Sequence, residues 1–381
     1  MNTVRLFVAV LILAAGAAAA RERPPQYIYR PVSVAFVPGF STNGSESRNV
    51  SSNFSLNIIG GYLGRVHGVE LGSVFNIDED EVLGYQSAGA VNILGGSFGG
   101  VQQAGAVNVV GNEFSGAQMA GAASIVGGDF VGAQMAGAVN IVGNGFSGAQ
   151  IAGAVNIAGE SMTGAQLAGA MNITRVARGL QLAGAANVAE ELSGAQIGVV
   201  NICGNGHGLQ LGVVNIAEDV DVPIGLLSIV KNGQFHVNVW ASEFSLVNLG
   251  IKTGSKTIYN IFMLGCRPRG DSTRVFGGIG LGGHIPFDRF FVDVDLLSHG
   301  MFTGPDWFPE SESYRLSSLR LTGGWQVTDM LALTAGPTLN VWVSDREDGS
   351  AVPFYDAPLY QWHGSEHVRI WPGFTIGLQL L

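Results

Sequence analysis

The chain has 381 residues, 57 of them glycine, with 13% charged residues and a formal net charge of −10. This acidic balance, without any cluster of basic residues, argues against a nucleic-acid partner. The glycines follow no strict G-X-Y order and the chain has only 13 prolines, which excludes a collagen.

Residues 1–20 have the pattern of a secretory signal peptide. Arg5 is followed by an apolar run from Leu6 to Leu13 and by small residues that end near Ala20. We therefore expect an exported protein. No cysteine stands at the expected cleavage point, so a lipoprotein anchor is not expected. No later run approaches the ~18 apolar residues of a transmembrane helix, so a membrane-spanning form would have to be a β-barrel.

Residues 27–67 are predicted to form an entry cap. Two strand-like segments, 27–40 and 51–61, are joined by a polar turn at 41–50. Terminal units of a repeat array are usually atypical, because they cover an otherwise open core and edge.

Residues 68–231 form a repeat array with a period of about sixteen residues. Such self-similarity indicates units that bury their apolar faces only against their neighbours. Ser124 fills the one missing position of an asparagine series, and Ser228 closes that series. The two series are Gln86, Gln102, Gln118, Gln134, Gln150, Gln166, Gln181, Gln196 and Gln210, and Asn76, Asn92, Asn108, Asn140, Asn156, Asn172, Asn187, Asn201 and Asn215.

Each repeat alternates with a period of two, which predicts strands. Met135 and Val139 fall on one face, and Gln134 and Asn140 fall on the other. A glycine every few residues disfavours helix. The turn of each unit carries an aromatic residue, and we expect these to stack on one another: Phe98, Phe114, Phe130 and Phe146.

The two polar series favour a β-solenoid over an antiparallel meander. Parallel stacking of the repeats in register would place each Gln beside the next Gln and each Asn beside the next Asn, within hydrogen-bonding reach. The alternative is one continuous outer-membrane β-barrel. It is supported by strand portions of membrane-spanning length and by the presence of only Glu113 and Asp129 as charges between Gly84 and Gly159.

Residues 234–381 are predicted to form a second, antiparallel β-domain that is barrel-like. In one segment Leu319 and Leu321 alternate with Arg320 and Thr322, an apolar-out and polar-in pattern. A soluble sandwich is the alternative. Eight candidate strands, enough to close a small barrel, lie at 235–242, 244–254, 257–267, 274–285, 289–298, 318–327, 331–343 and 374–381.

The links between these candidate strands differ in length. Polar insertions at 304–313 and 344–367 resemble external loops, whereas the short links at 286–288 and 328–329 resemble periplasmic turns. Their alternation supports a membrane barrel.

Few residues suggest chemistry. Gly278, Gly280 and Gly283 fit G-x-G-x-x-G, but no helix is predicted to follow, so close packing in a strand is favoured over dinucleotide binding. Asp293 and Asp295 share a strand face, where they would line a barrel lumen or face solvent in a sandwich.

Neither the histidines nor the cysteines indicate a metal site. His363, Glu366 and His367 share a segment that does not look helical, so a solvated loop is favoured. Cys203 and Cys266 are interpreted as two buried thiols, with a disulfide as the less favoured alternative. No catalytic, cofactor-binding or metal-binding residue is therefore predicted, no enzyme activity is expected, and any ligand-binding residues stay unidentified.

The repeats resemble a family of bacterial surface-repeat proteins known from spirochaetes and other Gram-negative groups, whose repeat is similar to G-x-Q-x-G-x-x-N. Two repeats with this spacing are Gly132, Gln134, Gly137, Asn140 and Gly148, Gln150, Gly153, Asn156. The resemblance extends to residues 32–44, 223–234, 252–270 and 331–345. It implies a location in the cell envelope or at the surface, and it supplies neither an enzyme activity nor a ligand.

Three functions follow as hypotheses. The first is a non-enzymatic outer-membrane or surface protein, in which the polar ladders of the solenoid form an extended, adhesin-like binding surface or a scaffold. The second is an outer-membrane pore or transporter. A secreted enzyme is the third, with an unrecognised site in the loops at 304–314 or 344–367.

Overall fold

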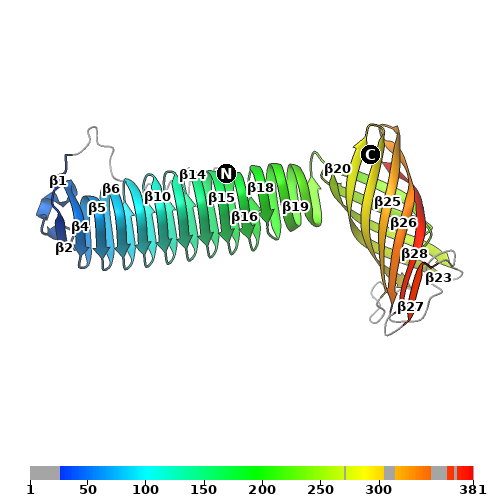
Figure 1. Cartoon of the computed structure of the whole chain (residues 1–381), viewed down its shortest axis with the longest axis horizontal. Helices are drawn as coiled ribbons and strands as arrows, with labels where there is room; N and C mark the ends of the chain where they lie inside the picture. The colour runs from blue at the N-terminus through cyan, green and yellow to red at the C-terminus, as the bar shows by residue number, and fades with distance from the viewer. Residues whose placement is uncertain (1–25, 270–271, 304–313, 345–357, 364–366, 381) are drawn as a thin grey trace. The chain divides into compact units, whose positions relative to one another are not determined.

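The computed structural model describes residues 26–269, 272–303, 314–344, 358–363 and 367–380 (Figure 1). Residues 1–20, where a signal peptide is predicted, and the polar insertion 304–313 lie outside the described residues. The chain divides into two compact units, 1–207 and 208–381, and each is described by itself.

The chain folds as a β-solenoid of about ten turns followed by a closed antiparallel β-barrel of eight strands. The predicted fold class is confirmed, and the alternative of one continuous barrel is wrong. The solenoid elements are β1 (Ile28–Tyr29), β2 (Val32–Val37), β3 (Phe40–Ser41), the 3-10 helix η1 (Gly44–Asn49), β4 (Val50–Asn57), β5 (Gly60–Gly72), β6 (Phe75–Ala88), β7 (Val91–Leu94), β8 (Ser97–Ala104), β9 (Val107–Val110), β10 (Phe114–Ala120), β11 (Ala123–Val126), β12 (Phe130–Ala136), β13 (Val139–Val142), β14 (Gly145–Ala152), β15 (Val155–Ala168), β16 (Met171–Ala183), β17 (Ala186–Val188), β18 (Glu191–Ile197) and β19 (Val200–Val230).

Successive coils of the solenoid stack in parallel and in register. Gln118 pairs with Gln134, and Asn140 with Asn156, so each residue lies beside its counterpart one repeat away. Parallel pairing already joins β4 to β5, so the stacking includes residues on the N-terminal side of Gly68.

A ladder of side-chain amides runs through the interior of the solenoid. The Nε2 of Gln134 donates to the Oε1 of Gln118 over 2.9 Å, and equivalent bonds of 2.7 to 2.9 Å connect the series from Gln86 to Gln196. Every glutamine in this series is fully buried. The amide-to-amide hydrogen bonds expected from the sequence are therefore present.

The asparagines form a second ladder with the opposite sense. The Nδ2 of Asn156 donates forward to the Oδ1 of Asn172 over 3.0 Å, whereas each glutamine donates backward. The same Nδ2 also donates to the backbone oxygen of Leu167 over 2.7 Å. Each asparagine thus joins its own coil to the next through both side chain and backbone.

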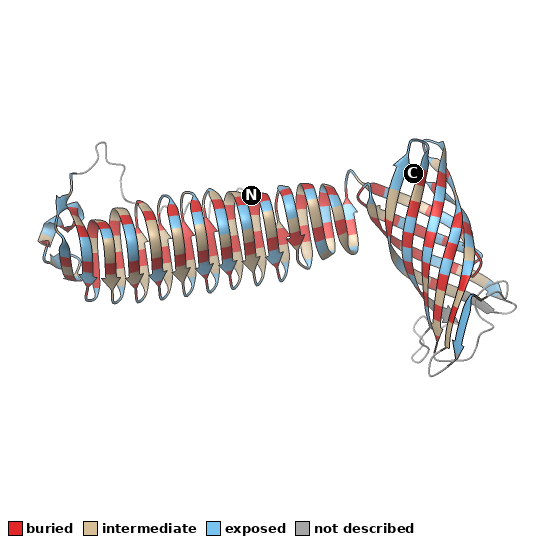
Figure 2. Ribbon diagram, in the orientation of Figure 1, coloured by how far each residue is buried: buried red, intermediate tan, exposed pale blue. Residues whose placement is uncertain are grey.

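The orientation of the two faces differs from one sequence-based hypothesis. The amide ladders point inward, and apolar residues such as Val131, Met135 and Ile151 are exposed on the outside (Figure 2). The hypothesis that the polar ladders form a binding surface is wrong, because no part of them is accessible. Buried amides are hydrogen-bonded to one another because an unpaired buried amide is costly.

The four phenylalanines of adjacent coils stack as expected. Phe98, Phe114 and Phe130 are nearly parallel, with centroid distances of 4.9 and 4.8 Å, and Phe146 follows at 5.5 Å. All four are buried. The stack continues in register with Val82 on one side and Met162 on the other, so it forms the apolar part of the interior.

One glycine per coil is required by the backbone. Gly132 has a φ of 128°, which is strained for other residues, and a Cβ there would lie 1.9 Å from the oxygen of Gly116. The same conformation recurs at the equivalent glycine of each coil from Gly68 to Gly208. Close stacking of the coils at this corner therefore depends on glycine.

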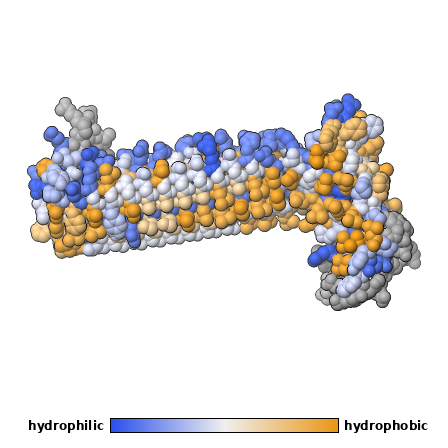
Figure 3. Space-filling view, viewed as in Figure 1, coloured by the Kyte–Doolittle hydropathy of each residue, from blue (hydrophilic) through white to orange (hydrophobic). Residues whose placement is uncertain are grey.

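Charged residues of the solenoid collect at one set of turns. Glu113, Asp129, Glu160 and Arg175 lie at the corner after the asparagine strand, where the repeat between Asp129 and Glu160 has the uncharged Asn144. Arg175 and Glu160 form an ion pair of 3.1 Å. Figure 3 shows a hydrophilic edge of the solenoid beside a more hydrophobic band.

The barrel is built from the eight antiparallel strands predicted from the sequence, and pairing of its first and last strands closes it. The turn between the fourth and fifth strands contains Asp288, at a φ of 58°. The short element β27 (Tyr360–His363) pairs with the start of the last strand. The barrel strands are β20 (Gln234–Ser242), β21 (Val247–Gly254), β22 (Ile258–Arg269), β23 (Ser272–Phe287), β24 (Phe290–Thr303), β25 (Tyr314–Thr328), β26 (Leu331–Ser344) and β28 (His367–Leu380).

Ser124 interrupts the asparagine ladder. It lies in register between Asn108 and Asn140, but its shorter side chain donates to the oxygen of Met135 over 3.4 Å. The Oδ1 of Asn140 consequently has no hydrogen-bond partner within the described part of the chain. A buried acceptor without a donor destabilises the native state.

Replacing Ser124 with Asn is expected to stabilise the central coils by about 1 kcal/mol, the usual net worth of a hydrogen bond. The new amide can donate to Asn140 and accept from Asn108. Hydrogen exchange of backbone amides in β10 to β14 measures the change. Ser147→Asn, at an exposed position of β14, is the control and should leave exchange unchanged. If these amides exchange in S124N as fast as in the unsubstituted protein, or faster, the asparagine ladder is not a source of stability.

Candidate functional site

The barrel lumen contains a buried network of charged side chains. The Lys252 ammonium contacts the Asp293 carboxylate at 2.5 Å and the Oε1 of Gln379 at 3.1 Å. The other Asp293 oxygen lies 2.7 Å from the Nδ1 of His284. Lys252 and Asp293 are almost fully buried, as expected for paired charges inside a protein.

A second carboxylate organises the neighbouring strands. Asp295 accepts from the Nε of Arg320 over 2.8 Å and from the Tyr259 hydroxyl over 2.7 Å. The Arg320 guanidinium also lies 4.7 Å from the ring centroid of Trp240. The prediction that Asp293 and Asp295 line a barrel lumen is confirmed. Both have basic or hydroxyl partners, so their arrangement is that of structural ion pairs.

Glu243 forms a third polar cluster in the barrel interior. Its carboxylate accepts from the Nδ2 of Asn340 over 2.5 Å, from the Nε1 of Trp371 over 3.3 Å, and from the backbone N–H of Phe374 over 3.1 Å. Because these donors belong to two strands, β26 and β28, the buried carboxylate holds both strands against the first turn of the barrel.

The glycines of β23 make room for these lumen groups. A Cβ at Gly282 would lie 2.3 Å from the Tyr259 ring, and one at Gly280 would lie 2.5 Å from the side chain of Leu297. No helix follows them, since β23 leads directly to β24. The G-x-G-x-x-G pattern therefore serves close packing, as the strand interpretation predicted.

Side chains fill the lumen between the polar clusters. Two apolar groups occupy it: Phe244, Phe276, Leu316, Trp342 and Trp371, and Trp240, Tyr259, Ile261, Met263 and Leu297. A cavity lined by Trp240, His299 and Arg320 measures about 10 Å³, room for at most one water. Within the described strands the lumen is packed rather than open.

The outer wall of the barrel has the opposite character. Leu296 is 63% exposed and Leu321 is 47% exposed, while the residues that alternate with them are buried (Figure 2). At the end with the short links, Phe290 and Trp325 stack with a centroid distance of 6.3 Å, and Phe287 is exposed beside them. The polarity is thus reversed relative to a soluble barrel.

The residues of β19 after Gly208 are fastened to the turn between β21 and β22. The Thr253 hydroxyl donates to the oxygen of Ser228 over 2.9 Å, and the Ser255 hydroxyl to the oxygen of Asp221 over 3.0 Å. Lys256 and Asp219 form an exposed ion pair of 3.1 Å. Side-chain donors of the barrel thus meet backbone acceptors of the last coils.

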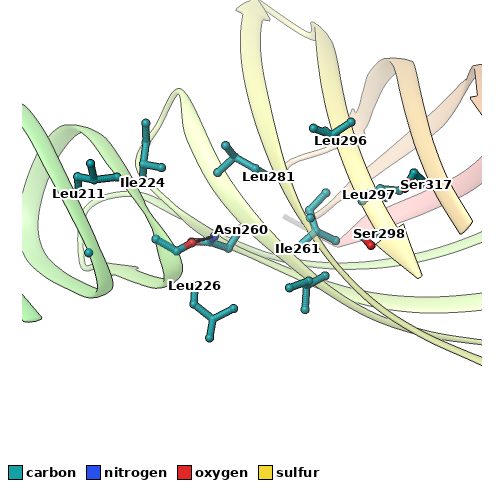
Figure 4. A pocket seen from close by; sticks show the side chains of 14 residues that line it. Leu211, Ile224, Leu226, Asn260, Ile261, Leu281, Leu296, Leu297, Ser298 and Ser317 are labelled. Carbon is teal, nitrogen blue, oxygen red and sulfur yellow. Dashed lines mark hydrogen bonds between the residues drawn. The ribbon is translucent and has the colours of Figure 1, made fainter. Parts of the chain in front are cut away.

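A groove of about 530 Å³ lies between these last coils and the barrel wall. In Figure 4, Leu211 and Ile224 lie on one side and Leu281 and Leu296 lie on the other. Asn260 is buried at the groove and donates to the oxygen of Gly225 over 2.6 Å. A second apolar hollow, of about 560 Å³, lies on the wall over Gly323 and Gly324.

The cysteines and the described part of the histidine segment provide no metal site. Cys203 and Cys266 are free thiols, and burial raises the pKa of the Cys203 thiol to about 12, which makes it unreactive at neutral pH. The side chain of His363 and all of Glu366 lie outside the described residues, so this cluster is not placed. No group of three potential metal ligands occurs within the described residues.

Sequence reasoning missed an acidic pair at the first rung of the glutamine ladder. Glu70 lies sixteen residues before Gln86, at the position that the repeat assigns to glutamine, so the sixteen-residue period could have identified it. The Nε2 of Gln86 donates to Glu70 over 2.9 Å and to Asp78 over 2.6 Å. Burial raises the pKa of both carboxyls, and that of Asp78 rises further because the Glu70 carboxylate lies beside it.

The chain was compared with protein-family models, with curated proteins and with solved structures, and none matches.

The acidic pair is expected to make the solenoid less stable as the pH rises. Because both pKa values are higher in the folded state than in the unfolded state, the folded protein binds more protons, and stability falls from the ordinary carboxyl range of 3.8 to 4.5 upward. Asp78→Asn keeps an acceptor for Gln86 and adds a donor for Glu70. We therefore expect greater stability at neutral pH and a flatter pH dependence.

Unfolding of the full-length protein, followed by far-ultraviolet circular dichroism between pH 4 and pH 8, measures this effect. Glu113→Gln, which removes an exposed charge, is the control and should keep the original slope. If D78N loses as much stability between pH 4 and pH 8 as the original protein does, the acidic pair is not the source of the pH dependence.

Proposed function

We propose that this protein is a non-enzymatic structural protein of the bacterial outer membrane, in which the barrel is the membrane anchor and the solenoid is a scaffold attached to it. The observation that carries the proposal is the reversed polarity of the barrel. Its wall is apolar at Leu296, Leu319 and Leu321, whereas Lys252, Asp293 and Arg320 are buried inside. An apolar wall around a polar interior is the pattern of outer-membrane barrels.

Helices give no competing means of insertion: among the described residues, none is long and apolar enough to span a membrane. Aromatic residues at the short-link end, Phe287, Phe290 and Trp325, match the interfacial girdle of such barrels. The expected signal peptide and the resemblance to envelope repeat proteins agree with export to this compartment.

Strand order favours a periplasmic position for the solenoid. The chain enters the barrel at Gln234 and leaves it at Leu380, at the same end as the short links after Gly254, Phe287 and Thr328. Outer-membrane barrels place short turns in the periplasm and long loops outside. The solenoid precedes Gln234, so we place it on the periplasmic side, as a scaffold and not as a surface adhesin.

The packed lumen argues against the pore hypothesis. An eight-stranded barrel is just wide enough for side chains to fill, and here Trp240, Trp342 and Trp371 fill much of it. The proposed barrel is therefore an anchor.

Placing a charge on the outer wall is expected to impair assembly of the barrel. Leu321→Arg, near the middle of β25, should cost about 2–4 kcal/mol at the bilayer midplane and lower recovery from the outer-membrane fraction. Folded barrel is measured by the mobility shift on a detergent gel with and without boiling. Leu182→Arg, on the outside of the solenoid, is the control and should assemble normally. If the unsubstituted protein is soluble and shows no mobility shift, the proposal is wrong.

A protease experiment tests the position of the solenoid. On intact cells, a periplasmic solenoid should be protected, and it should become accessible only after the outer membrane is permeabilised. Epitope tags inserted beside Asn144, an exposed turn residue of the array, and in the 304–313 segment report the two sides. Antibody access to the Asn144 tag on intact cells would place the solenoid at the surface and contradict the proposed topology.

A further inference from the structure

We propose that the groove between the last coils and the barrel wall holds one acyl chain of a bilayer phospholipid whose head group supplies a hydrogen-bond donor. This inference rests on the proposed membrane position of the barrel. It adds a specific binding site to what is otherwise an anchor, and the site is formed jointly by β19 and by strands β22 to β25.

The lining of the groove suits a hydrocarbon chain. Leu211, Ile224 and Leu226 come from the coils, and Leu281 and Leu296 come from the barrel (Figure 4). The volume of about 530 Å³ lies within the range of sites that hold small ligands. None of the lining residues is charged, so nothing in the groove requires an ionic ligand.

The groove is continuous with the wall that we place in the bilayer. Leu281 and Leu296 are exposed residues of the outer wall and also line the groove. Leu319, which pairs with Leu296 in the sheet, extends the apolar wall beyond it. An acyl chain can therefore enter from the surrounding lipid without crossing a polar surface.

Asn260 supplies an independent indication of a ligand. This side chain lines the groove and is only 4% exposed. Its Nδ2 is bonded to Gly225, but its Oδ1 has no hydrogen-bond partner among the described residues. A buried acceptor of this kind calls for a donor. The Oδ1 of Asn260 has almost no accessible surface, so the ammonium or hydroxyl of a lipid head group reaches it once this side chain turns toward the groove.

The groove is also preformed. Thr253, Ser255 and Thr257 each donate a hydroxyl to a carbonyl of the last coils, over 2.9 to 3.1 Å. These bonds fix the two walls before a ligand arrives. A preformed apolar site loses little conformational freedom on binding, which favours affinity.

Photocrosslinking tests the inference with the full-length protein. The protein is reconstituted in vesicles of phosphatidylethanolamine and phosphatidylglycerol that contain a phosphatidylethanolamine with a diazirine in its acyl chain. After illumination, labelled peptides are mapped. We expect label on both walls of the groove, at residues 211–226 of β19 and at residues 279–298 of β23 and β24. Label over Gly323 and Gly324 reports ordinary lipid around the barrel.

Filling the groove should remove its label selectively. Leu296→Trp displaces at least two methylenes of the chain, which predicts about tenfold less label on β19. Leu321→Trp, an equally outward change outside the groove, is the matched control and should leave the label unchanged. If L296W does not assemble, Leu226→Trp fills the groove from the coil side instead. Leu182→Trp is the control for this second variant.

The outcomes separate this inference from the membrane proposal. The groove site is overturned if label appears on the barrel wall but not on β19. It is also overturned if L296W and L321W lose label equally. Either result leaves the barrel in the membrane. A crosslink from β19 to a protein in place of lipid also overturns it. No label anywhere, with a protein that shows no heat-dependent mobility shift, overturns the membrane position itself.

Discussion

Burial of one glutamine and one asparagine per coil, with Ser124 in place of one asparagine, is the constraint on which the solenoid depends. Inside a coil these amides have few partners, and the equivalent amide one coil away provides a hydrogen bond of 2.7 to 3.0 Å. A shift of one residue in register would replace Gln or Asn by an outward apolar residue and leave the buried amides unpaired. Parallel, in-register stacking follows from this requirement, and it in turn brings the phenylalanines face to face and the glycines into close contact.

The barrel uses a related solution with charges in place of amides. Its interior holds three carboxylates, Glu243, Asp293 and Asp295, and each has donors from other strands. Large side chains are accommodated because glycine stands opposite them, as Gly282 does opposite Tyr259. Polar atoms and volume are satisfied inside, so most outward positions between the strand ends can be apolar. This separation of inside and outside is what supports the proposed lipid surrounding of the wall.

Much of this architecture could be predicted from the sequence because it is encoded by spacing. The sixteen-residue period predicted the stacking of Phe114 on Phe130, and alternation around Arg320 predicted the barrel strands. Spacing does not say which face is inside: the sequence-based hypothesis made the polar ladders a binding surface, whereas Gln134 is fully buried. Because each buried amide pairs with its counterpart in the next coil, the polar face can be the inner one. The groove at Asn260 was not predictable, because residues far apart in the chain form it.

The opposite senses of the two amide ladders have a consequence for the length of the array. Each Gln amide of the ladder from Gln86 to Gln196 points its nitrogen toward the N-terminal coils, whereas each Asn amide from Asn140 to Asn187 points its nitrogen toward the C-terminal coils. The dipoles of the two columns therefore oppose each other, in contrast to the aligned peptide dipoles of an α-helix. Adding or removing a coil therefore adds little net side-chain dipole along the array, so these two columns set no electrostatic limit on the number of repeats.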